Sequence, residues 1–572
     1  MKKIVLLLIV VVLLGAGSAY FLFQTSSEPA DTGYADYLPA DTLATISLRD
    51  LNGLAELFPN TALGNFLSKE TMGRILSDLQ VDPRIIRDYV EGYDQLFSVL
   101  QNPGFRMIFG DDVDIGLLPV DADLFSVDPQ QAMERSMVLL ATTSSSKALE
   151  TFARTLLQKD VSEFTSGDLS LTRIKLDEEN TMYAYTEGNR LILAHTPAAI
   201  ERCVAAKASG ETLQQAAHFI TVMKFWRGLS MTKQYSRGFV QLDRLQPYLL
   251  ASGDEDLQTA GRYLEGMQFV GTAGGQTENG WKIESVSRYD YAFLDPAVKE
   301  LVDSASKENG TLQLLGDNPL LYSWSSSLGS SALLETLSAT EEEQYKELDN
   351  RLQQQLGFSL DKVVQAFGPQ YGLILKEIVQ EGMFPLPKVV LFLQVKDHQV
   401  ADALLQQIRQ KAATRGMTGE QQRQVGKYTI YFWALLPGEA TQPAVVLTED
   451  MLYLANGPDS LKKLLNGELN RTHLSGSVDM KLGPESARQI EAANNGILVL
   501  WPSRFADQVQ GAADWLAGMV EASRGGSISV LKDELLLLLQ STEVAVFVSD
   551  LFPDHGRAMV TFKEEREKEV AR

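Results

Sequence analysis

The chain repeats one ordered set of sequence patterns, and this repetition limits its possible folds more than any other feature. In the first half, Arg190 opens a short apolar strand that is followed by Pro197 and an amphipathic helix. In the second half, Met451 opens a matching strand, followed by Pro458 and another helix. Proline is favoured in the first turn of a helix, where its missing N–H leaves no hydrogen bond unmade. The two segments therefore predict the same strand–helix unit twice.

Further pairs of patterns occur in the same order in both halves. They are residues 136–141 with 388–395, 109–110 with 367–368, 238–243 with 496–501, and a closing hairpin at 267–288 with another at 543–563. The offset between the halves is larger at the hairpins, which predicts an insertion around Gln510 to Gln540. Short strands that alternate with helices and hairpins predict an α+β fold. We expect two related modules, each a mainly antiparallel sheet covered by helices on one face.

The patterns also give the expected organisation of the 572-residue chain. We expect an N-terminal membrane anchor or signal peptide at 1–26, a tether at 27–36, a first α+β module at 37–290, a connecting helix at 291–309, a second α+β module at 310–563 and a charged tail at 564–572. Asp295 and Pro296 support the connecting helix, since Asp caps helices and Pro fits their first turn.

Residues 4–23 form an apolar run without a charge, directly after Lys2 and Lys3. A helix of that length spans ~30 Å, the thickness of the hydrocarbon core of a bilayer. Because flanking lysines stay on the cytoplasmic side, we expect a single pass through the inner membrane with the C-terminal body in the periplasm. A cleaved signal peptide is the alternative, since Gly17, Ser18 and Ala19 make an acceptable cleavage site.

The charge and the cysteine content exclude several classes of function. A formal net charge of −23 repels phosphate backbones, so we expect no nucleic-acid partner. Cys203 is the one cysteine of the chain, which excludes an intrachain disulfide and a cysteine-based zinc site. The five histidines are far apart and lack the spacing of metal ligands.

The pattern Ser-x-x-Lys, which acyl-enzymes use, occurs at Ser144, Ser304 and Ser460. The companion motifs of those enzymes are missing, and Ser144 and Ser460 fall where helix caps are expected. His195 and His398 lie at predicted strand–helix junctions, where polar residues are common. We interpret all five as structural residues, and predict no catalytic, cofactor-binding or metal-binding residues.

Three other features have an ordinary structural interpretation. The acidic residues Asp111, Asp112 and Asp114 predict a solvated turn, because they lack the spacing of a calcium loop. Cys203 is expected as a small buried residue on a helix. Leu535 to Leu539 are expected in a buried helix or strand, with a surface that faces lipid or a partner as the alternative.

Three segments of the chain together resemble a known family. After the apolar run come residues 37–48 (YLPADTLATISL), and the second half contains residues 356–361 (LGFSLD) and 388–397. Together these resemble a bacterial exported family catalogued as domain of unknown function thirty-three fifty-two, and the likeness covers most of the chain after residue 36. The resemblance implies an envelope protein of unassigned activity, and it supplies no site residues.

These observations favour a non-enzymatic interaction or scaffold protein of the envelope. Its partners would be the inner membrane, through residues 4–23, and an envelope protein that the sequence does not identify. A carrier of lipid or of another hydrophobic ligand is the alternative, since sheets with helical covers can enclose an apolar cleft. A hydrolase with dispersed site residues is a third hypothesis.

Overall fold

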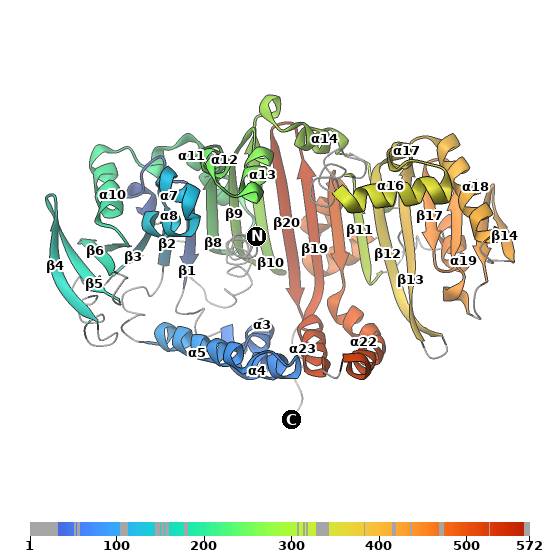
Figure 1. The fold of residues 1–572 in the computed structure, drawn as a ribbon, viewed down its shortest axis with the longest axis horizontal. Helices are drawn as coiled ribbons and strands as arrows, with labels where there is room; N and C mark the ends of the chain where they lie inside the picture. Colours follow the sequence, from blue (N-terminus) through green and yellow to red (C-terminus); the bar gives the residue numbers. More distant parts are fainter. Residues whose placement is uncertain are drawn as a thin grey trace. The chain divides into compact units, whose positions relative to one another are not determined.

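The computed structural model describes residues 33–50, 53, 58–102, 104, 112–143, 149, 154, 159–176, 181–305, 308–312, 315, 319–327, 342–381, 384–414, 419–434, 438–467, 474–524 and 527–565 (Figure 1). The predicted anchor and most of the predicted tether and tail lie outside these ranges. The chain divides into two compact units between Asp295 and Pro296. We call them unit 1 and unit 2 and describe each by itself.

Unit 1 contains an antiparallel sheet of ten described strands. They are β1 (Ala44–Arg49), β2 (Asp112–Leu117), β3 (Met137–Thr142), β4 (Asp160–Ser166), β5 (Leu169–Lys175), β6 (Thr181–Glu187), β7 (Arg190–Ala194), β8 (Lys233–Gln241), β9 (Met267–Thr277) and β10 (Gly280–Tyr289). Their order across the sheet is β4-β5-β6-β7-β3-β2-β1-β8-β9-β10, and every neighbouring pair is antiparallel.

The helices of unit 1 fill the connections between these strands. They are η1 (Gly33–Asp36), η2 (Phe58–Asn60), α3 (Ala62–Phe66), α4 (Lys69–Asp78), α5 (Pro83–Leu100), α7 (Ala122–Val127), α8 (Pro129–Ser136), α10 (Pro197–Ser209), η4 (Leu213–Gln215), α11 (Ala217–Gly228), α12 (Leu242–Ala251), α13 (Glu255–Tyr263) and η5 (Tyr291–Phe293). Thr196 caps α10 by accepting a hydrogen bond from the backbone N–H of Ala199, which fixes where that helix begins.

Unit 2 also contains an antiparallel sheet of ten described strands. They are β11 (Leu321–Ser325), β12 (Phe367–Glu381), β13 (Phe384–Val395), β14 (Glu420–Val425), β15 (Tyr428–Trp433), β16 (Ala444–Leu447), β17 (Met451–Ala455), β18 (Gly496–Leu500), β19 (Thr542–Leu551) and β20 (His555–Glu564). Their order is β14-β15-β16-β17-β13-β12-β11-β18-β19-β20.

The helices of unit 2 precede its first strand or lie in connections between its strands. They are α14 (Pro296–Ser304), α16 (Glu342–Leu356), α17 (Leu360–Ala366), α18 (His398–Thr414), η7 (Glu439–Thr441), α19 (Pro458–Leu465), α20 (Leu474–Leu482), α21 (Pro484–Ala492), α22 (Pro502–Arg524) and α23 (Ser529–Gln540). The predicted α+β class and the antiparallel pairing of strands are therefore confirmed.

The two sheets have the same strand order along the chain, and their residue pairing is also equivalent. Ala44 of β1 pairs with Leu117 and Val240, and Leu321 of β11 pairs with Leu375 and Leu500. Likewise, Ala194 ends β7 opposite Val138 and Tyr183. In unit 2, Ala455 ends β17 opposite Val390 and Ala444. This register defines which residues of the two units are equivalent.

Helices pack on both faces of the sheet of unit 2, so the expectation of a single covered face does not hold there. Leu404 and Leu405 of α18 pack with Trp433 and Leu452 in one buried cluster. Leu461 of α19 belongs to a different cluster, with alternate residues of the same strands. Because successive side chains of a strand point to opposite faces, the two helices lie on opposite sides of the sheet.

The insertion predicted around Gln510 to Gln540 consists of longer helices and adds no further strand or helix to the described part of the connection. Between β8 and β9, unit 1 has α12 and α13, and between β18 and β19, unit 2 has α22 and α23. The predicted burial of Leu535 to Leu539 is wrong, because none of the residues of α23 is buried and the side chain of Leu537 is 59% exposed.

Across the described ranges, no helix combines the length and the apolar character needed to cross a membrane.

Candidate functional site

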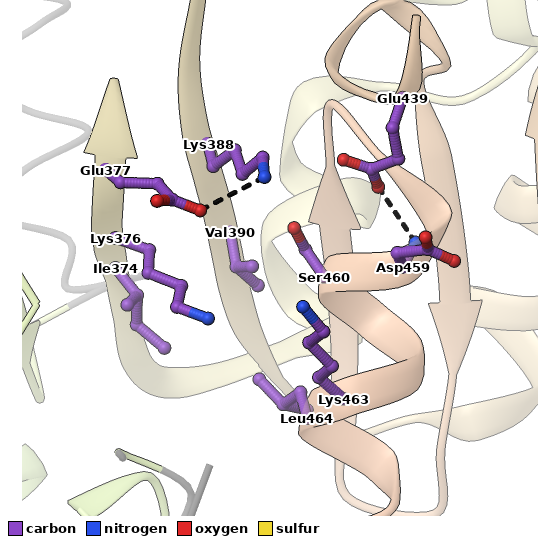
Figure 2. Close-up of a pocket in the computed structure, with 10 residues that line it drawn as sticks. All are labelled: Ile374, Lys376, Glu377, Lys388, Val390, Glu439, Asp459, Ser460, Lys463 and Leu464. Atoms are coloured by element: carbon purple, nitrogen blue, oxygen red, sulfur yellow. Dashed lines mark hydrogen bonds and ion pairs between the residues drawn. The ribbon is translucent and has the colours of Figure 1, made fainter. Parts of the chain in front are cut away.

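A cavity of about 130 Å³ lies in unit 2 between α19 and the hairpin of β12 and β13 (Figure 2). Its apolar side is formed by Ile374, Val390 and Leu464, which belong to the main buried cluster of the unit. Its polar side is formed by charged side chains and one hydroxyl. They are Lys376, Glu377, Lys388, Glu439, Asp459, Ser460 and Lys463.

The hairpin reaches the cavity because β12 and β13 continue beyond their other neighbours. β11 pairs with β12 as far as Leu375, and β17 pairs with β13 from Val390 onward. Beyond these points the two strands pair only with each other, and their register shifts between Leu375 and Glu377. Such a bulge changes the direction of nearby side chains, and here Lys376 lines the cavity.

Lys376 of β12 and Lys463 of α19 extend toward each other, and Ser460 lies above Lys463 on the same helix (Figure 2). Neither lysine forms a hydrogen bond or an ion pair with another described residue. The pKa of Lys376 is lowered, first because its ammonium group is partly removed from water and second because Lys463 carries a like charge nearby. Glu377 acts on Lys376 in the opposite direction but does not reverse the shift, so the arrangement brings two ammonium groups together that are only partly balanced.

The remaining charged groups around the cavity have partners. Lys388 Nζ lies 3.0 Å from Glu377 Oε1. Asp459 forms an ion pair with Arg423. Their charges are thus compensated locally, which separates them from Lys376 and Lys463.

Glu439 has a structural role at the start of α19. Its carboxylate accepts a hydrogen bond of 2.9 Å from the backbone N–H of Asp459. The predicted capping role of Ser460 is wrong, because Ser460 lies inside the first turn and Gly457 occupies the cap position. A Cβ at Gly457 would lie 2.1 Å from Glu439 Oε1, so glycine there lets the glutamate approach the helix end. Ser460 Oγ is left to line the cavity.

The equivalent position in unit 1 is filled. The register places Gly116 and Leu118 where unit 2 has Ile374 and Lys376, and Leu118 is 1% exposed. A Cβ at Gly116 would lie 2.8 Å from Leu38 Cδ2, so the side chain of Leu38 takes the space above it. Ala199, buried in the same cluster, stands where unit 2 has Ser460.

The cation that corresponds to Lys463 is also paired in unit 1. Counted from Pro197 and Pro458, Arg202 is equivalent to Lys463. Its guanidinium lies 3.0 Å from Asp41 Oδ2 and donates a hydrogen bond to the carbonyl of Pro119. The cavity and its uncompensated lysines therefore occur in one of two equivalent places.

The other residues that the sequence singled out do not gather at this cavity. Ser304 ends α14 and donates a hydrogen bond of 2.9 Å to the carbonyl of Leu301. His195 lies between β7 and α10, and His398 is the first residue of α18. Ser144 lies outside the described residues.

The acidic run of unit 1 is not a solvated turn, so that prediction is wrong for Asp112 and Asp114. Both belong to β2, and Arg49 lies 3.4 Å from Asp112 and 3.2 Å from Asp114. Burial raises the pKa of Asp114 to about 6, although Arg49 acts in the opposite direction. Asp111 lies outside the described residues.

Two further expectations concern Cys203 and metal binding. Cys203 is buried on α10, as predicted, and burial raises the pKa of its thiol to about 12. A thiol with so high a pKa is not a nucleophile at neutral pH. Within the described ranges, no three His, Cys, Asp or Glu side chains lie close enough together to hold a metal ion.

The sequence shows Ser460 and Lys463 as a motif, but no motif contains Lys376 or Glu439. Lys376 follows an apolar segment of the sequence, and only the register of β12 brings it near Ser460 and Lys463. A residue-by-residue alignment of the two halves would have exposed it, since it replaces Leu118 at a buried position. Glu439 gives no such signal, because it caps a helix that begins well after it in the chain.

Comparison of the chain with protein-family models, with curated proteins and with solved structures finds no match. The resemblance to the exported bacterial family therefore stays a prediction. The function is therefore inferred from the geometry of the two units.

Proposed function

We propose that the protein is a membrane-anchored, non-enzymatic binding protein of the bacterial envelope. In this proposal, residues 4–23 hold the chain in the inner membrane and the body faces the periplasm. The two units are related modules, of which unit 2 binds a ligand or partner through the cavity beside α19. The observation that carries the proposal is that Lys376 and Lys463 line the cavity of unit 2 without an ion-pair partner among the described residues. The equivalent place in unit 1 is filled by buried apolar side chains.

The relation between the modules is supported by their equivalent strand order and residue register. A shared ancestral module explains why chemically unlike residues, such as Leu118 and Lys376, occupy the same place in two sheets. Duplication followed by divergence lets one copy keep a packed core while the other acquires a site.

Binding is favoured over catalysis by the composition of the cavity. An acyl-enzyme needs a base in hydrogen-bonding contact with the nucleophile. Among the described contacts, none joins Ser460 Oγ to Lys463 Nζ, and the carboxylates beside them are engaged with Arg423, Lys388 and the end of α19. The cavity offers positive charge and a hydroxyl donor, which suits recognition of an anion.

The volume of the cavity also bears on the lipid-carrier alternative. A dry cavity of ~150 Å³ holds a molecule the size of benzene. The space beside α19 is about 130 Å³ and is lined by three lysines, so it suits a headgroup rather than an acyl chain.

Two experiments test the proposal. In the first, spheroplasts of cells that express the full chain are treated with protease. We expect the chain to sediment with membranes and its body to be digested; a body that is protected, or a chain that is soluble, would contradict the predicted location.

The second experiment separates binding from catalysis in a strain that lacks the gene and has a scored envelope phenotype. We expect the double variant Lys376→Gln, Lys463→Gln to lose complementation, and Ser460→Ala, which removes one neutral donor, to weaken it only in part, with both proteins at normal abundance. Complete loss of complementation by an abundant Ser460→Ala protein would instead indicate that Ser460 is a nucleophile.

A further inference from the structure

The cavity beside α19 has one end that is positively charged and another that is neutral. Figure 2 shows Glu377 above Lys376 on the same strand, and Glu439 and Asp459 near the start of α19; each of these acids has a partner, whereas Lys376 and Lys463 extend toward each other below them. A ligand that balances the charges of the cavity therefore needs its negative charge between these two lysines.

The donors around that end match a particular kind of anion. Lys376 and Lys463 supply two ammonium groups, and Ser460 supplies a hydroxyl. A phosphate monoester carries a charge of about −1.5 to −2 at pH 7 and has three acceptor oxygens. A carboxylate has a single charge and two oxygens, so it would leave one lysine uncompensated.

The surroundings are consistent with an anion that is partly removed from water. Ile374, Val390 and Leu464 line the cavity and are buried, which lowers the effective dielectric constant there. The pKa of Lys376 is lowered, first by partial removal of its ammonium group from water and second by the like charge of Lys463. A bound dianion would offset both effects.

From this geometry, and on the basis of the proposed binding function of unit 2, we propose that the cavity binds a phosphate-monoester group through Lys376, Lys463 and Ser460. The equivalent place in unit 1 does not bind it, because Leu38 and Leu118 fill the space and Arg202 is paired with Asp41. The source of the phosphate is either a small soluble molecule or a lipid headgroup.

The test is calorimetric titration of the full chain in detergent with inorganic phosphate at pH 7.5 and constant ionic strength. We expect saturable binding that weakens about tenfold for Lys376→Gln and again for Lys463→Gln, since each removes a charge-assisted hydrogen bond. Lys376→Arg and Lys463→Arg retain the charge and keep binding. Arg202→Gln in unit 1 is the matched control and leaves the affinity unchanged.

Two further arms define the ligand. Acetate should bind at least tenfold more weakly than phosphate, and phosphate affinity should fall as the pH is lowered from 7.5 and the dianion is protonated. Vesicles containing phosphatidic acid compete with phosphate if the source is a headgroup, whereas vesicles containing phosphatidylglycerol, a diester, do not. Absence of competition by phosphatidic acid assigns the site to a soluble phosphate; either result supports a phosphate monoester.

Three results would overturn the inference: no saturable phosphate binding by the wild-type chain, equal binding by the double glutamine variant, or acetate binding as tight as phosphate. The thermal unfolding of each variant without ligand shows whether it is folded. Failure here leaves the proposed function intact if the same double variant still loses complementation, because the cavity would then bind another ligand.

Discussion

The places in front of α10 and α19 are equivalent in the two sheets but differ in what occupies them. Both helices begin with a proline soon after an alanine that ends a strand, and both pack on the same strands of their sheets. In unit 1 the place in front of the helix is occupied by Leu38 and Leu118, whereas in unit 2 it is open and lined by lysines. The backbone is thus compatible with either a packed core or a charged cavity.

The connection between the second and third strands explains part of this difference. In unit 1 the chain leaves β2 and forms α7 and α8 before it returns as β3. In unit 2 β12 and β13 continue beyond the sheet as a hairpin that brings Lys376 and Lys388 beside α19. In unit 2 the longer hairpin therefore forms one wall of the cavity, in the connection where unit 1 has α7 and α8.

The largest effect is expected when the charge of unit 2 is placed in unit 1. Leu118→Lys buries an ammonium group that has no carboxylate partner, and should destabilise unit 1 by ~4 kcal/mol. The reverse change, Lys376→Leu, removes a partly buried charge and should alter the free energy of unfolding by less than ~1 kcal/mol. Urea denaturation of the full chain measures both, and equal effects would contradict the assignment of Leu118 and Lys376 as equivalent residues.

A second contrast concerns the core leucines Leu193 and Leu454, which the register makes equivalent. Leu193 is 6% exposed in a buried cluster, whereas Leu454 is only partly buried beside another. Leu193→Ala should therefore cost ~3 kcal/mol and Leu454→Ala ~2 kcal/mol, because the cost follows the contacts that are lost. Thermal unfolding with Leu193→Ile as the conservative control checks this ranking; a larger loss for Leu454→Ala would contradict it.

Much of this architecture could be predicted from the sequence because it depends on local signals. Apolar strands, the prolines at 197 and 458, and the closing hairpins each leave a pattern within a few residues. The sheet order could not be predicted, since the pairing of β1 with β8, or of β11 with β18, joins strands far apart in the chain. The charged cavity depends on the pairing of β13 with β17, which brings α19 beside the hairpin, so its residues could not be assembled from spacing alone.

The wrong predictions share a physical cause. The acidic residues Asp112 and Asp114 look solvated in the sequence, but Arg49 on the neighbouring strand makes their burial possible. The leucines of α23 look buried, yet a helix in which leucine follows leucine must expose part of them, whichever face packs. In both cases the secondary structure and the packing around the segment, and not its local composition, determine exposure.

The two sheets should also respond differently to pH. Asp114 of β2 is replaced in unit 2 by Gly372, which leaves room for Phe392. The pKa of Asp114 is raised by burial to about 6, above the usual value of an unfolded chain, so the folded state binds its proton more tightly. Unit 1 should therefore gain ~2 kcal/mol as the pH falls from 7 to 4 through this group, and lose it as the pH rises.

Asp114→Asn removes this proton linkage and should flatten the pH dependence of unit 1 over that range. Stability measured by urea denaturation at several pH values, with Asp121→Asn as an exposed control, tests the expectation. Asp121 caps α7 and Asn caps helices equally well, so Asp121→Asn should change stability little, both at pH 5 and at pH 7. A pH profile that Asp114→Asn leaves unchanged would show that another group is responsible.

The smallest expected effect separates the two equivalent cations. Arg202 forms an exposed pair with Asp41, so Arg202→Ala should destabilise unit 1 by ~0.5 kcal/mol, and less at high salt. Lys463 forms no ion pair with another described residue and lies near the like charge of Lys376, so Lys463→Ala should change stability little in the absence of ligand. Adding inorganic phosphate should reverse that order, because the wild-type chain then gains stability that Lys463→Ala lacks while Arg202→Ala keeps it. Paired thermal melts of the two variants, with and without phosphate, measure this reversal, and its absence would mean that α10 and α19 differ in packing but not in ligand binding.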